Sequence, residues 1–292
     1  MQSVGEGSAG FNVRGGSADQ NLILLYGSPV YNASHLFGFF SSVNSEVIKD
    51  VTLYKGGIPA RYGGRISSVL DIGTRDGNRQ EFAGKAGISP ITTQLMVEGP
   101  VIKDKLTYML AGRSTYSNWM LHMFDNSSLK NSSASFYDLN GKVVLDIDKN
   151  NKLDLSFYNS HDAFRFNSDT LYAYDNNIVA LRWRHFFSNS LFSQITLNNS
   201  NYRYNISGTD PAEEAFMMSH RINSTSAKAD FNWFMGRHEL NFGSDLIRYS
   251  VLPGKYMPEN DSSLVVPQIL DEEHAYEAGI YVDDKFIVTE YF

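Results

Sequence analysis

Few residues of this 292-residue chain stand at the spacings that chemistry on a substrate requires. Residues 5–10, GEGSAG, have the glycine spacing of a dinucleotide-binding loop, but that loop needs a helix after it, and a strand-like segment follows here. DIDKNN, from Asp146, has the opening of a calcium-binding loop, but Asn151 and Phe157 stand where that loop needs glycine and glutamate. We therefore reject both sites and expect a tight hairpin turn after Asp146.

Histidine, cysteine, serine and carboxylate residues also form no recognisable catalytic or metal-binding motif. The seven histidines include no zinc spacing such as H-E-x-x-H, cysteine is absent, and no G-x-S-x-G nucleophile motif occurs. No compact pair of carboxylates stands in a cleft-like context. The sequence therefore predicts a protein that is not an enzyme and that has no metal site and no cofactor.

Composition narrows the class of partner. The formal net charge is −7 and no basic tract is present, so the chain offers no electrostatic footprint for nucleic acid. The absence of cysteine excludes a disulfide framework and suits an exported bacterial protein. No apolar run is long enough for a transmembrane helix, and no secretory signal opens the chain.

The elements that must position any functional residue differ between two regions of the chain. Up to about Asp76 the strand-like segments are short and bounded by glycine, which predicts a small α/β unit. Its helix is expected around Ser41 to Ile48, with Ser42 or Asn44 as the cap before Glu46. The four segments read FNVRGG, NLILLYGSPVYN, VIKDVTLYKGGIPARYGGR and ISSVLDIGTRDG.

From about Gln80 onward, longer segments alternate between apolar and polar residues. In Tyr137 to Ile147, Leu139 and Val143 lie on the apolar face, while Asp138 and Lys142 lie on the polar face. A soluble β-sandwich would show the same alternation, because it also buries one face of each sheet. Alternation alone therefore leaves a membrane barrel and a sandwich open.

Connection lengths favour the barrel. Short and long connections alternate along the chain, as they do between the two sides of bacterial outer-membrane barrels. Aromatic residues gather beside the tight turns, as in an interfacial girdle. The tight connections are expected at 99–105, 148–151, 188–190, 235–237 and 283–285, and the long ones at 117–134, 160–175, 208–220 and 253–273.

Counting the crossings gives about ten antiparallel strands and the start of another. If the chain enters the barrel on the same side of the membrane as the connection at 99–105, it must cross the membrane an even number of times between these two points. We therefore divide Glu81 to Glu98 into two strands at Ser89 and Pro90. The further strands are expected near 105–117, 135–147, 151–163, 175–187, 190–207, 218–234, 237–251 and 274–283, with a stub from Phe286. Such a sheet has an unpaired edge, which lipid does not tolerate, so we interpret the sequence as a fragment.

The glycine-bounded segments carry a resemblance to a known family. FNVRGG, NLILLYGSPVYN, SHLFGFFSSVN and, most specifically, YKGGIPARYGGRISSVLDIGT resemble the second half of the plug domain of TonB-dependent outer-membrane receptors of the Bacteroidetes type. The resemblance implies a mainly β protein with a partial plug at residues 1–76 and a partial transmembrane β-barrel at residues 77–292, in a barrel of about 22 strands when complete. It also implies that a signal peptide, a TonB box and the first half of the plug are missing.

Several turn residues follow from that resemblance. Glycines at the motif positions would permit turns with positive φ and a close approach of the plug backbone to the barrel wall. Tyr26 stands where the family usually has an aspartate, which puts in doubt a hydrogen bond into that turn. The glycines in question are Gly15, Gly16, Gly27, Gly63 and Gly64.

Charged residues of the plug suggest a lock. Arg14, Arg61 and Arg65 would be enclosed by a barrel with a polar interior, where an unpaired charge costs several kcal/mol. We expect one or more of them to pair with a barrel carboxylate such as Glu98 and to hold the plug until TonB pulls. Surface exposure of the arginines remains the alternative.

The aromatic segment SHLFGFFSSVN offers candidates for ligand contact at the plug apex: His35, Phe37, Phe39 and Phe40. Packing of these side chains inside the plug is the competing interpretation.

The function implied by the resemblance is active import through a plugged barrel. A scarce nutrient such as a siderophore, haem or an oligosaccharide would be bound and then carried across the bacterial outer membrane without chemistry on the ligand. Partners would be the TonB–ExbB–ExbD complex, through the missing N-terminal segment, outer-membrane lipid and an unidentified ligand. Two alternatives stay open: a plugless porin or adhesin barrel, and a soluble carbohydrate-binding sandwich.

Overall fold

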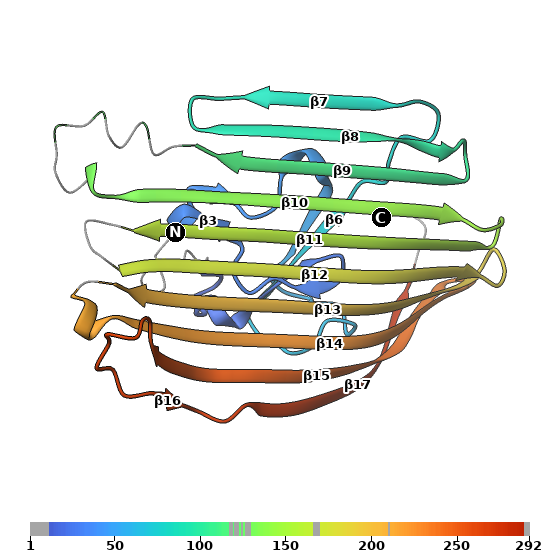
Figure 1. Cartoon of the computed structure of the whole chain (residues 1–292). Helices are drawn as coiled ribbons and strands as arrows, with labels where there is room; N and C mark the ends of the chain where they lie inside the picture. Colours follow the sequence, from blue (N-terminus) through green and yellow to red (C-terminus); the bar gives the residue numbers. More distant parts are fainter. Residues whose placement is uncertain are drawn as a thin grey trace.

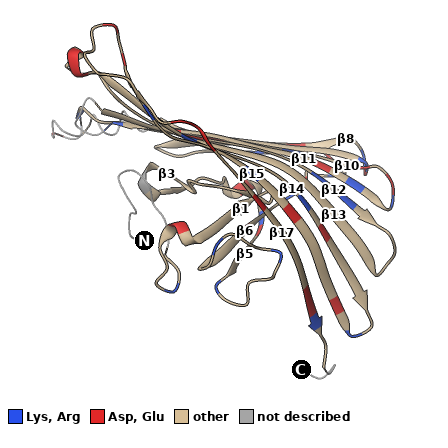
Figure 2. Ribbon diagram, turned by 90° about the horizontal axis from the view of Figure 1, so that it is seen from below, with Lys and Arg blue, Asp and Glu red and all other residues tan. Residues whose placement is uncertain are grey.

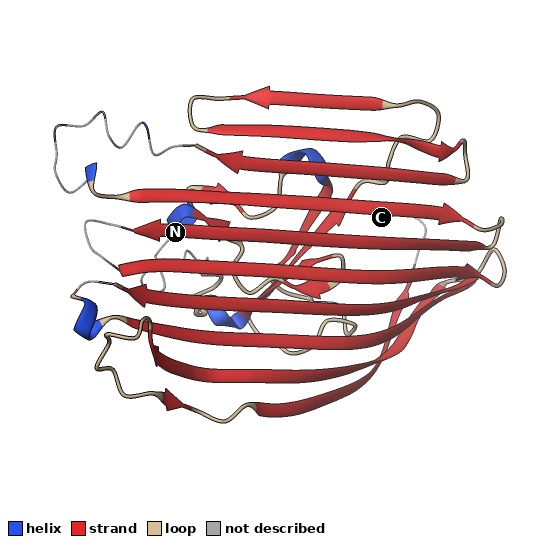
Figure 3. Ribbon diagram, viewed as in Figure 1, coloured by secondary structure: helices blue, strands red, loops and turns tan. Residues whose placement is uncertain are grey.

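The computed structural model describes residues 12–288, apart from 117, 118, 120–122, 124, 126–129, 166–169 and 210 and the side chain of Phe37. A long antiparallel sheet curves around a small N-terminal unit, which lies on the concave side of the sheet (Figures 1 and 2). Helices are confined to single short turns in the described residues (Figure 3). The chain is therefore mainly β, as the sequence predicts.

The N-terminal unit is built on a four-stranded sheet in the order β2-β1-β6-β5. β1 runs parallel to β6, while the β1–β2 and β5–β6 pairs are antiparallel. A separate ribbon of two short strands, β3 and β4, projects from it. The bounds are β1 Asn21–Leu25, β2 Ser28–Pro29, β3 Ser34–His35, β4 Phe40–Ser41, β5 Ile48–Tyr54 and β6 Ser68–Thr74, with 3-10 turns η1 Ala18–Gln20, η2 Leu36–Gly38 and η3 Ser45–Val47.

Two predictions for this unit are wrong. The segment FNVRGG forms no strand over its described residues and instead turns back, with the Gly16 N–H donating to the Val13 carbonyl (2.9 Å). The helix expected from Ser41 to Ile48 is only the single turn η3, because the chain is extended up to Asn44 and enters β5 at Ile48. The predicted cap does form, since the Asn44 side chain accepts a hydrogen bond from the Glu46 N–H.

The curved sheet contains ten long strands, each paired antiparallel with its neighbours. This agrees with the predicted strand count and with the division at Ser89 and Pro90. A further two-residue strand, β16, pairs with the far end of β15. The bounds are β7 Ala83–Ile88, β8 Thr92–Ile102, β9 Leu106–Thr115, β10 Ser133–Asp146, β11 Asn151–Arg165, β12 Thr170–Phe186, β13 Leu191–Gly208, β14 Phe216–Met235, β15 His238–Pro258, β16 Gln268–Ile269 and β17 Glu273–Phe286, with the turn η4 Ala212–Glu214 between β13 and β14.

The tight connections β8–β9, β10–β11, β12–β13 and β14–β15 lie at one end of this sheet, called the turn end here (Figure 1). The longest connections, β9–β10, β13–β14 and β15–β17, lie at the opposite, loop end, together with the short β7–β8 connection. The Asp104 N–H donates to the Arg79 carbonyl (3.3 Å), so the segment that leads into β7 lies beside the tight turn between β8 and β9. The chain therefore enters the curved sheet at the turn end, as the parity argument requires.

Several predicted connections are wrong in position. Residues 283–285 lie inside β17 and form no turn, and no strand starts at Phe286, which ends β17. The expected loops at 160–175 and 253–273 are shorter, because β11 continues to Arg165 and β15 continues to Pro258. The apolar–polar contrast fades where strands extend past the apolar band, so alternation could not locate these strand ends.

The two faces of the sheet have opposite character. Asp138 and Asn140 of β10 are buried against the N-terminal unit, while Leu139 and Val143 between and beyond them are exposed on the convex face. The next strands repeat this pattern, with Asp154, Ser156 and Ser160 buried and Leu155, Val179, Leu181 and Leu197 exposed. A soluble sandwich would bury the apolar face instead. The structure therefore contradicts the sandwich alternative.

One apolar cluster joins the N-terminal unit to the sheet. Leu25, Val43 and Val47 of the unit pack with Met109 and Tyr158 of the sheet, and all five side chains are almost completely buried. Side chains of both parts form this cluster, so burial of apolar surface against the sheet stabilises the N-terminal unit. In the described residues no helix is long and apolar enough to cross a membrane.

Candidate functional site

The contacts between the N-terminal unit and the polar concave face form two charged clusters, one near each end of the sheet. The apical cluster lies near the loop end and centres on His35 of β3. The basal cluster lies near the turn end and centres on Asp76, in the connection between β6 and β7.

In the apical cluster, His35 sits between two carboxylates of the sheet. Its Nδ1 lies 2.6 Å from Asp162 Oδ2 on β11, and its Nε2 lies 3.6 Å from Asp138 Oδ2 on β10. The imidazole stacks on Phe136, with ring centroids 4.2 Å apart and planes 9° apart. Arg113 of β9 completes the cluster, since its Nε donates to Asp138 Oδ2 (2.7 Å) and its guanidinium also donates to the Ser41 carbonyl (2.6 Å).

The electrostatics of this cluster favour a protonated imidazole. The side chains of His35 and Asp138 are 0% exposed and that of Asp162 is 3% exposed, so none of the three charges is solvated. Burial alone would lower the pKa of His35, but the two carboxylates outweigh it and raise this pKa above the ordinary value. His35 therefore tends to carry a positive charge.

Asp162 also fixes the backbone after His35. Its Oδ1 accepts a hydrogen bond from the Leu36 N–H (3.3 Å), and Leu36 has φ 46°, a left-handed conformation that non-glycine residues rarely adopt. Such a residue costs about 1–3 kcal/mol and persists only where its surroundings hold it. One carboxylate of the sheet thus holds both the ring and the strained backbone of the apex.

Phe39 is the candidate ligand contact that remains exposed, at 82% of its surface. Phe40 packs on Phe136 of β10, with ring centroids 5.2 Å apart, so it contacts the sheet rather than the interior of the N-terminal unit. His35 is completely buried, so it contacts the sheet rather than solvent. The side chain of Phe37 lies outside the described part of the chain.

In the basal cluster, Asp76 bridges two lysines of the sheet. Its Oδ1 lies 2.7 Å from Lys142 Nζ on β10, and its Oδ2 lies 2.6 Å from Lys152 Nζ on β11. Arg75 and Arg79 on either side reach Glu98 of β8 (2.5 Å) and Asp146 of β10 (2.7 Å). The connection is therefore held to three strands by alternating charges.

This anchor is charged over a wide pH range. Burial alone would raise the pKa of Asp76, but the ammonium groups of Lys142 and Lys152 outweigh it and hold this pKa well below the ordinary value. The backbone of Gly77 next to it touches the sheet so closely that a Cβ atom there would overlap the Tyr108 carbonyl. Asp76 and Gly77 together seat the connection on the sheet.

Besides these clusters, polar side chains of the sheet bind backbone carbonyls of the N-terminal unit. These contacts need no particular side chain in the unit, so sequence motifs do not reveal them. The pairs are Ser200 Oγ to Pro29 O (2.7 Å), Tyr158 Oη to Ser42 O (2.8 Å), Asn176 Nδ2 to Asn32 O (3.4 Å), Asn198 Nδ2 to Gly27 O (3.5 Å) and Lys228 Nζ to Arg61 O (2.6 Å).

The arginines expected to pair with the sheet lie elsewhere. Arg61 donates to the Tyr62 hydroxyl (2.8 Å) and Arg65 to the Gly64 carbonyl (2.7 Å). Glu98 does pair with an arginine, but the partner is Arg75. In the described residues, Arg14, Arg61 and Arg65 form no ion pair, so the predicted pairing is wrong here, while a role in locking stays a prediction.

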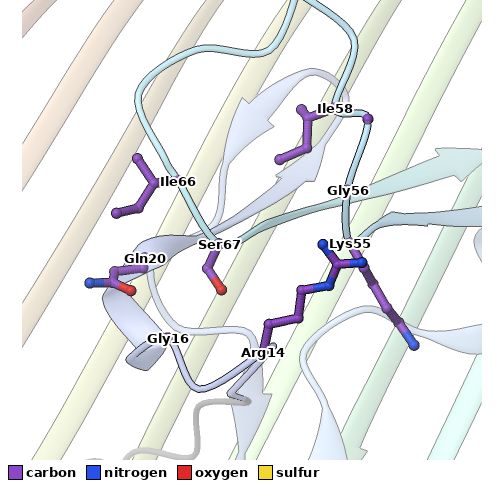
Figure 4. A pocket seen from close by; sticks show the side chains of 9 residues that line it. Arg14, Gly16, Gln20, Lys55, Gly56, Ile58, Ile66 and Ser67 are labelled. Carbon is purple, nitrogen blue, oxygen red and sulfur yellow. The ribbon is translucent and has the colours of Figure 1, made fainter.

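Arg14 lines a pocket of about 440 Å³ within the N-terminal unit (Figure 4). Lys55 stands beside it, and the remaining wall comes from glycine backbone and from Gln20, Ile58, Ile66 and Ser67. Both cations are exposed, so the pocket is an open depression rather than an enclosed site.

The predicted turn glycines divide into two groups. Gly15, Gly27 and Gly64 have positive φ, while Gly16 and Gly63 do not. A Cβ atom at Gly16 would crowd Ser67 of the same unit rather than the sheet.

Tyr26 and Gly27 form the β1–β2 turn with φ of 57° and 78°, the left-handed pair of a type I′ hairpin. Tyr26 stands where an aspartate would provide a hydrogen-bond acceptor to the turn, and its side chain is buried instead. Its ring is 4% exposed in the shared core, and its hydroxyl has no hydrogen-bond partner in the described residues.

Sequence reasoning missed Asp138, Asp162, Arg113 and Asp76. A signal was present, since Asp138 and Asp162 fall on the polar face of neighbouring strands near one end, where two carboxylates require cations. Alternation gives the face of each residue but not its partner, because the partner His35 lies 127 positions away from Asp162 in sequence.

Comparisons with known proteins agree with this arrangement. Residues 1–69 match the family model described as the TonB-dependent Receptor Plug Domain. No match was found among curated proteins.

Solved structures of low sequence identity share the fold. The copper transporter OprC superposes with a TM-score of 0.70 at 9% identity, over 93% of this chain and 45% of that one. A variant of the ferric enterobactin receptor PfeA from Pseudomonas aeruginosa gives 0.67 at 14% identity, over 94% and 48%. The ferric preacinetobactin receptor BauA from Acinetobacter baumannii gives 0.65 at 12% identity, over 98% and 50%. The chain spans about half the length of these relatives.

Proposed function

Because the chain has the plug domain and the fold of a TonB-dependent receptor, we propose that it is part of an outer-membrane receptor that binds a scarce nutrient and imports it actively. The N-terminal unit is the plug of this receptor, and the curved sheet is part of the wall of its barrel. Residues 1–76 form the plug portion and residues 77–292 the wall portion. The boundary between them falls in the connection between β6 and β7.

The observation that carries this proposal is the plug seated on a polar concave face beneath a convex apolar face. Outer-membrane barrels point apolar side chains at lipid and polar side chains at the lumen. The long strands, of 14 to 21 residues in β10 to β15, exceed the roughly 9 to 11 residues that a tilted strand needs to cross a bilayer. Both features support a bacterial outer-membrane location.

Energy input is part of the proposal because the plug is firmly held. Two charged clusters, a shared apolar core and several backbone contacts would have to yield before a ligand could pass. The partner that supplies this work would be the TonB–ExbB–ExbD complex of the inner membrane, pulling on the receptor's N-terminal part.

The ligand would be met at the loop end, where Phe39 of the plug is exposed. Stacked aromatic rings follow the wall near this end: Tyr174 and Tyr204 have centroids 4.9 Å apart and planes 7° apart, and Tyr204 lies 6.0 Å from His220. Tyr174 stands opposite Asp162 in the register and so faces the lumen with it. Tyr174 itself is 4% exposed, so the ligand-facing rings would be the half-buried Tyr204 and His220. Aromatic faces bind flat, partly apolar ligands such as an oligosaccharide or an aromatic metal chelate.

A growth test separates import from other outer-membrane roles. Strains that lack the receptor, or lack TonB, would be grown with ferric siderophores, haem, cobalamin or oligosaccharides as the scarce nutrient. We expect both strains to fail on the same nutrient and a receptor gene in trans to restore growth. A receptor deletion that shares no growth defect with the TonB deletion would contradict the proposal.

A further inference from the structure

The apical cluster is electrically balanced only if His35 carries a proton. Asp138 and Asp162 contribute two negative charges, and Arg113 contributes one positive charge, all on side chains that are at most 11% exposed. A neutral His35 would leave one net negative charge enclosed between plug and wall, which is unfavourable in a site shielded from water.

The geometry of the imidazole points to the same protonation state. An ionised carboxylate only accepts hydrogen bonds, so Nδ1 of His35 must donate to Asp162 across their 2.6 Å contact. In the neutral ring Nε2 would then carry a lone pair aimed at Asp138, 3.6 Å away, and this atom has no hydrogen-bond partner in the described residues. A proton on Nε2 converts that repulsion into attraction.

Apart from Arg113, no cation of the described wall strands forms an ion pair in this cluster, and His161, next to Asp162 on β11, pairs instead with Asp175 (Nδ1–Oδ1 2.8 Å). β9 presents Arg113, β10 presents Asp138, and β11 presents Asp162 together with the Tyr158 hydroxyl, which donates to the Ser42 carbonyl. On β12 the residue opposite Asp162 is the neutral Tyr174. Among the described residues, His35 is the one side chain of the plug that forms an ion pair in this cluster.

We propose that His35 is a proton-dependent latch that fixes the plug apex, including Leu36 and the exposed Phe39, to β10 and β11, and that loss of its proton frees the apex while the base of the plug stays anchored. His35 is thus a positioning residue for the ligand-facing apex. The inference rests on the proposed function only in treating Phe39 as ligand-facing.

The direction of the pH response follows from the raised pKa of His35. The stabilisation is fully present below the pKa of an unfolded histidine, about 6.5, and is lost as pH rises through the higher pKa of the folded state. Asp76 behaves in the opposite way, because its pKa is depressed and its ion pairs are lost only in strong acid. A shift to alkaline pH therefore loosens the apex selectively.

A spin label at the apex tests the latch directly. The chain contains no cysteine, so Phe39→Cys gives a single labelling site in this chain, and Thr52→Cys on β5 gives a matched site elsewhere in the plug. The label's mobility would be measured by electron paramagnetic resonance in the intact protein in lipid vesicles, from about pH 6 to about pH 9, a range that brackets the imidazole titration.

In the parent protein we expect the label at position 39 to become several-fold more mobile as pH rises, while the label at position 52 does not change. His35→Asn keeps a donor near Asp162 but no charge, so its label at position 39 should be mobile at every pH. Asp138→Asn balances the cluster without a proton on His35, so the pH response should disappear. Equal mobility at both ends of the pH range in the parent, or an unchanged response in His35→Asn, would overturn the proposal.

A second measurement needs no variant of the cluster. In the parent protein labelled with carbon-13 histidine, the resonance of His35 should titrate above about pH 6.5. Titration at or below that value would refute a charged latch, whatever the growth tests show about import.

Discussion

His35 and Asp76 play matching parts in the plug, each lying between two wall residues of opposite charge. They differ in what holds the charge in place. Asp76 is a carboxylate between two ammonium groups and stays ionised across the physiological range, whereas His35 depends on a proton that it can lose. The plug is therefore held permanently at the base and conditionally at the apex.

The variant Asp76→Asn tests the basal anchor. It leaves Lys142, whose side chain is 4% exposed, without its carboxylate, so we expect a loss of about 3 kcal/mol in the free energy of unfolding. The loss should be nearly constant between about pH 5 and pH 8, because a depressed carboxyl pKa contributes stability at every pH above the unfolded value of about 3.9. Chemical denaturation in micelles would measure it.

Asp261→Asn, in an exposed loop, is the matched control and should change the unfolding free energy little. A loss for Asp76→Asn no larger than for this control would show that the basal ion pairs do not stabilise the plug.

Removal of two buried tyrosine hydroxyls is expected to change stability in different ways. Tyr26→Phe removes a hydroxyl that has no hydrogen-bond partner in the described residues, so we expect unchanged or slightly increased stability. Tyr158→Phe removes the 2.8 Å bond to the Ser42 carbonyl, which links wall and plug, so we expect a loss of about 1 kcal/mol. Urea midpoints of both variants would be compared, and equal losses would contradict the assignment.

At the scale of elements, periodicity predicts which face of a strand each residue occupies. It does not predict contacts between residues that are far apart in the chain. The faces of β10 follow from local alternation, and the division between β7 and β8 follows from the required even number of crossings. The ion-pair partner of Glu98 cannot be predicted in this way, because the sequence does not distinguish Arg75 from Arg14 without the position of the plug against the wall. Leu36 shows a third case, since its left-handed backbone is stabilised by Asp162 of a distant strand and has no local sequence signature.

The convex face supplies a prediction about membrane insertion. Val179, in the middle of β12, is 51% exposed, and Ile147, beside a tight turn, is 47% exposed. In lipid, Val179→Lys should cost about 2–4 kcal/mol because lysine would lie near the midplane, while Ile147→Lys near the interface should cost about 0–1 kcal/mol. Folding titrations into lipid vesicles would measure both. Two equal, small effects would indicate that this face meets water.

At the scale of the whole molecule, the plug and the wall share one apolar core and close one lumen. Leu25 and Val47 of the plug are completely buried against the wall, so removal of the plug would expose both a polar lumen and an apolar patch. A plugless porin would have no such dependence on its first 76 residues. Because the chain spans about half the length of its solved relatives, the comparison belongs in the receptor that contains this chain.

The most direct test of the plugged-receptor account is the conductance of that receptor in planar bilayers, measured with and without residues 12–76. The intact receptor should show almost no steady conductance, and the deletion should open a large, stable channel, with the amount of protein inserted in the outer membrane checked beforehand. Equal conductance of the two proteins would contradict the account, because the N-terminal unit would then not close the barrel.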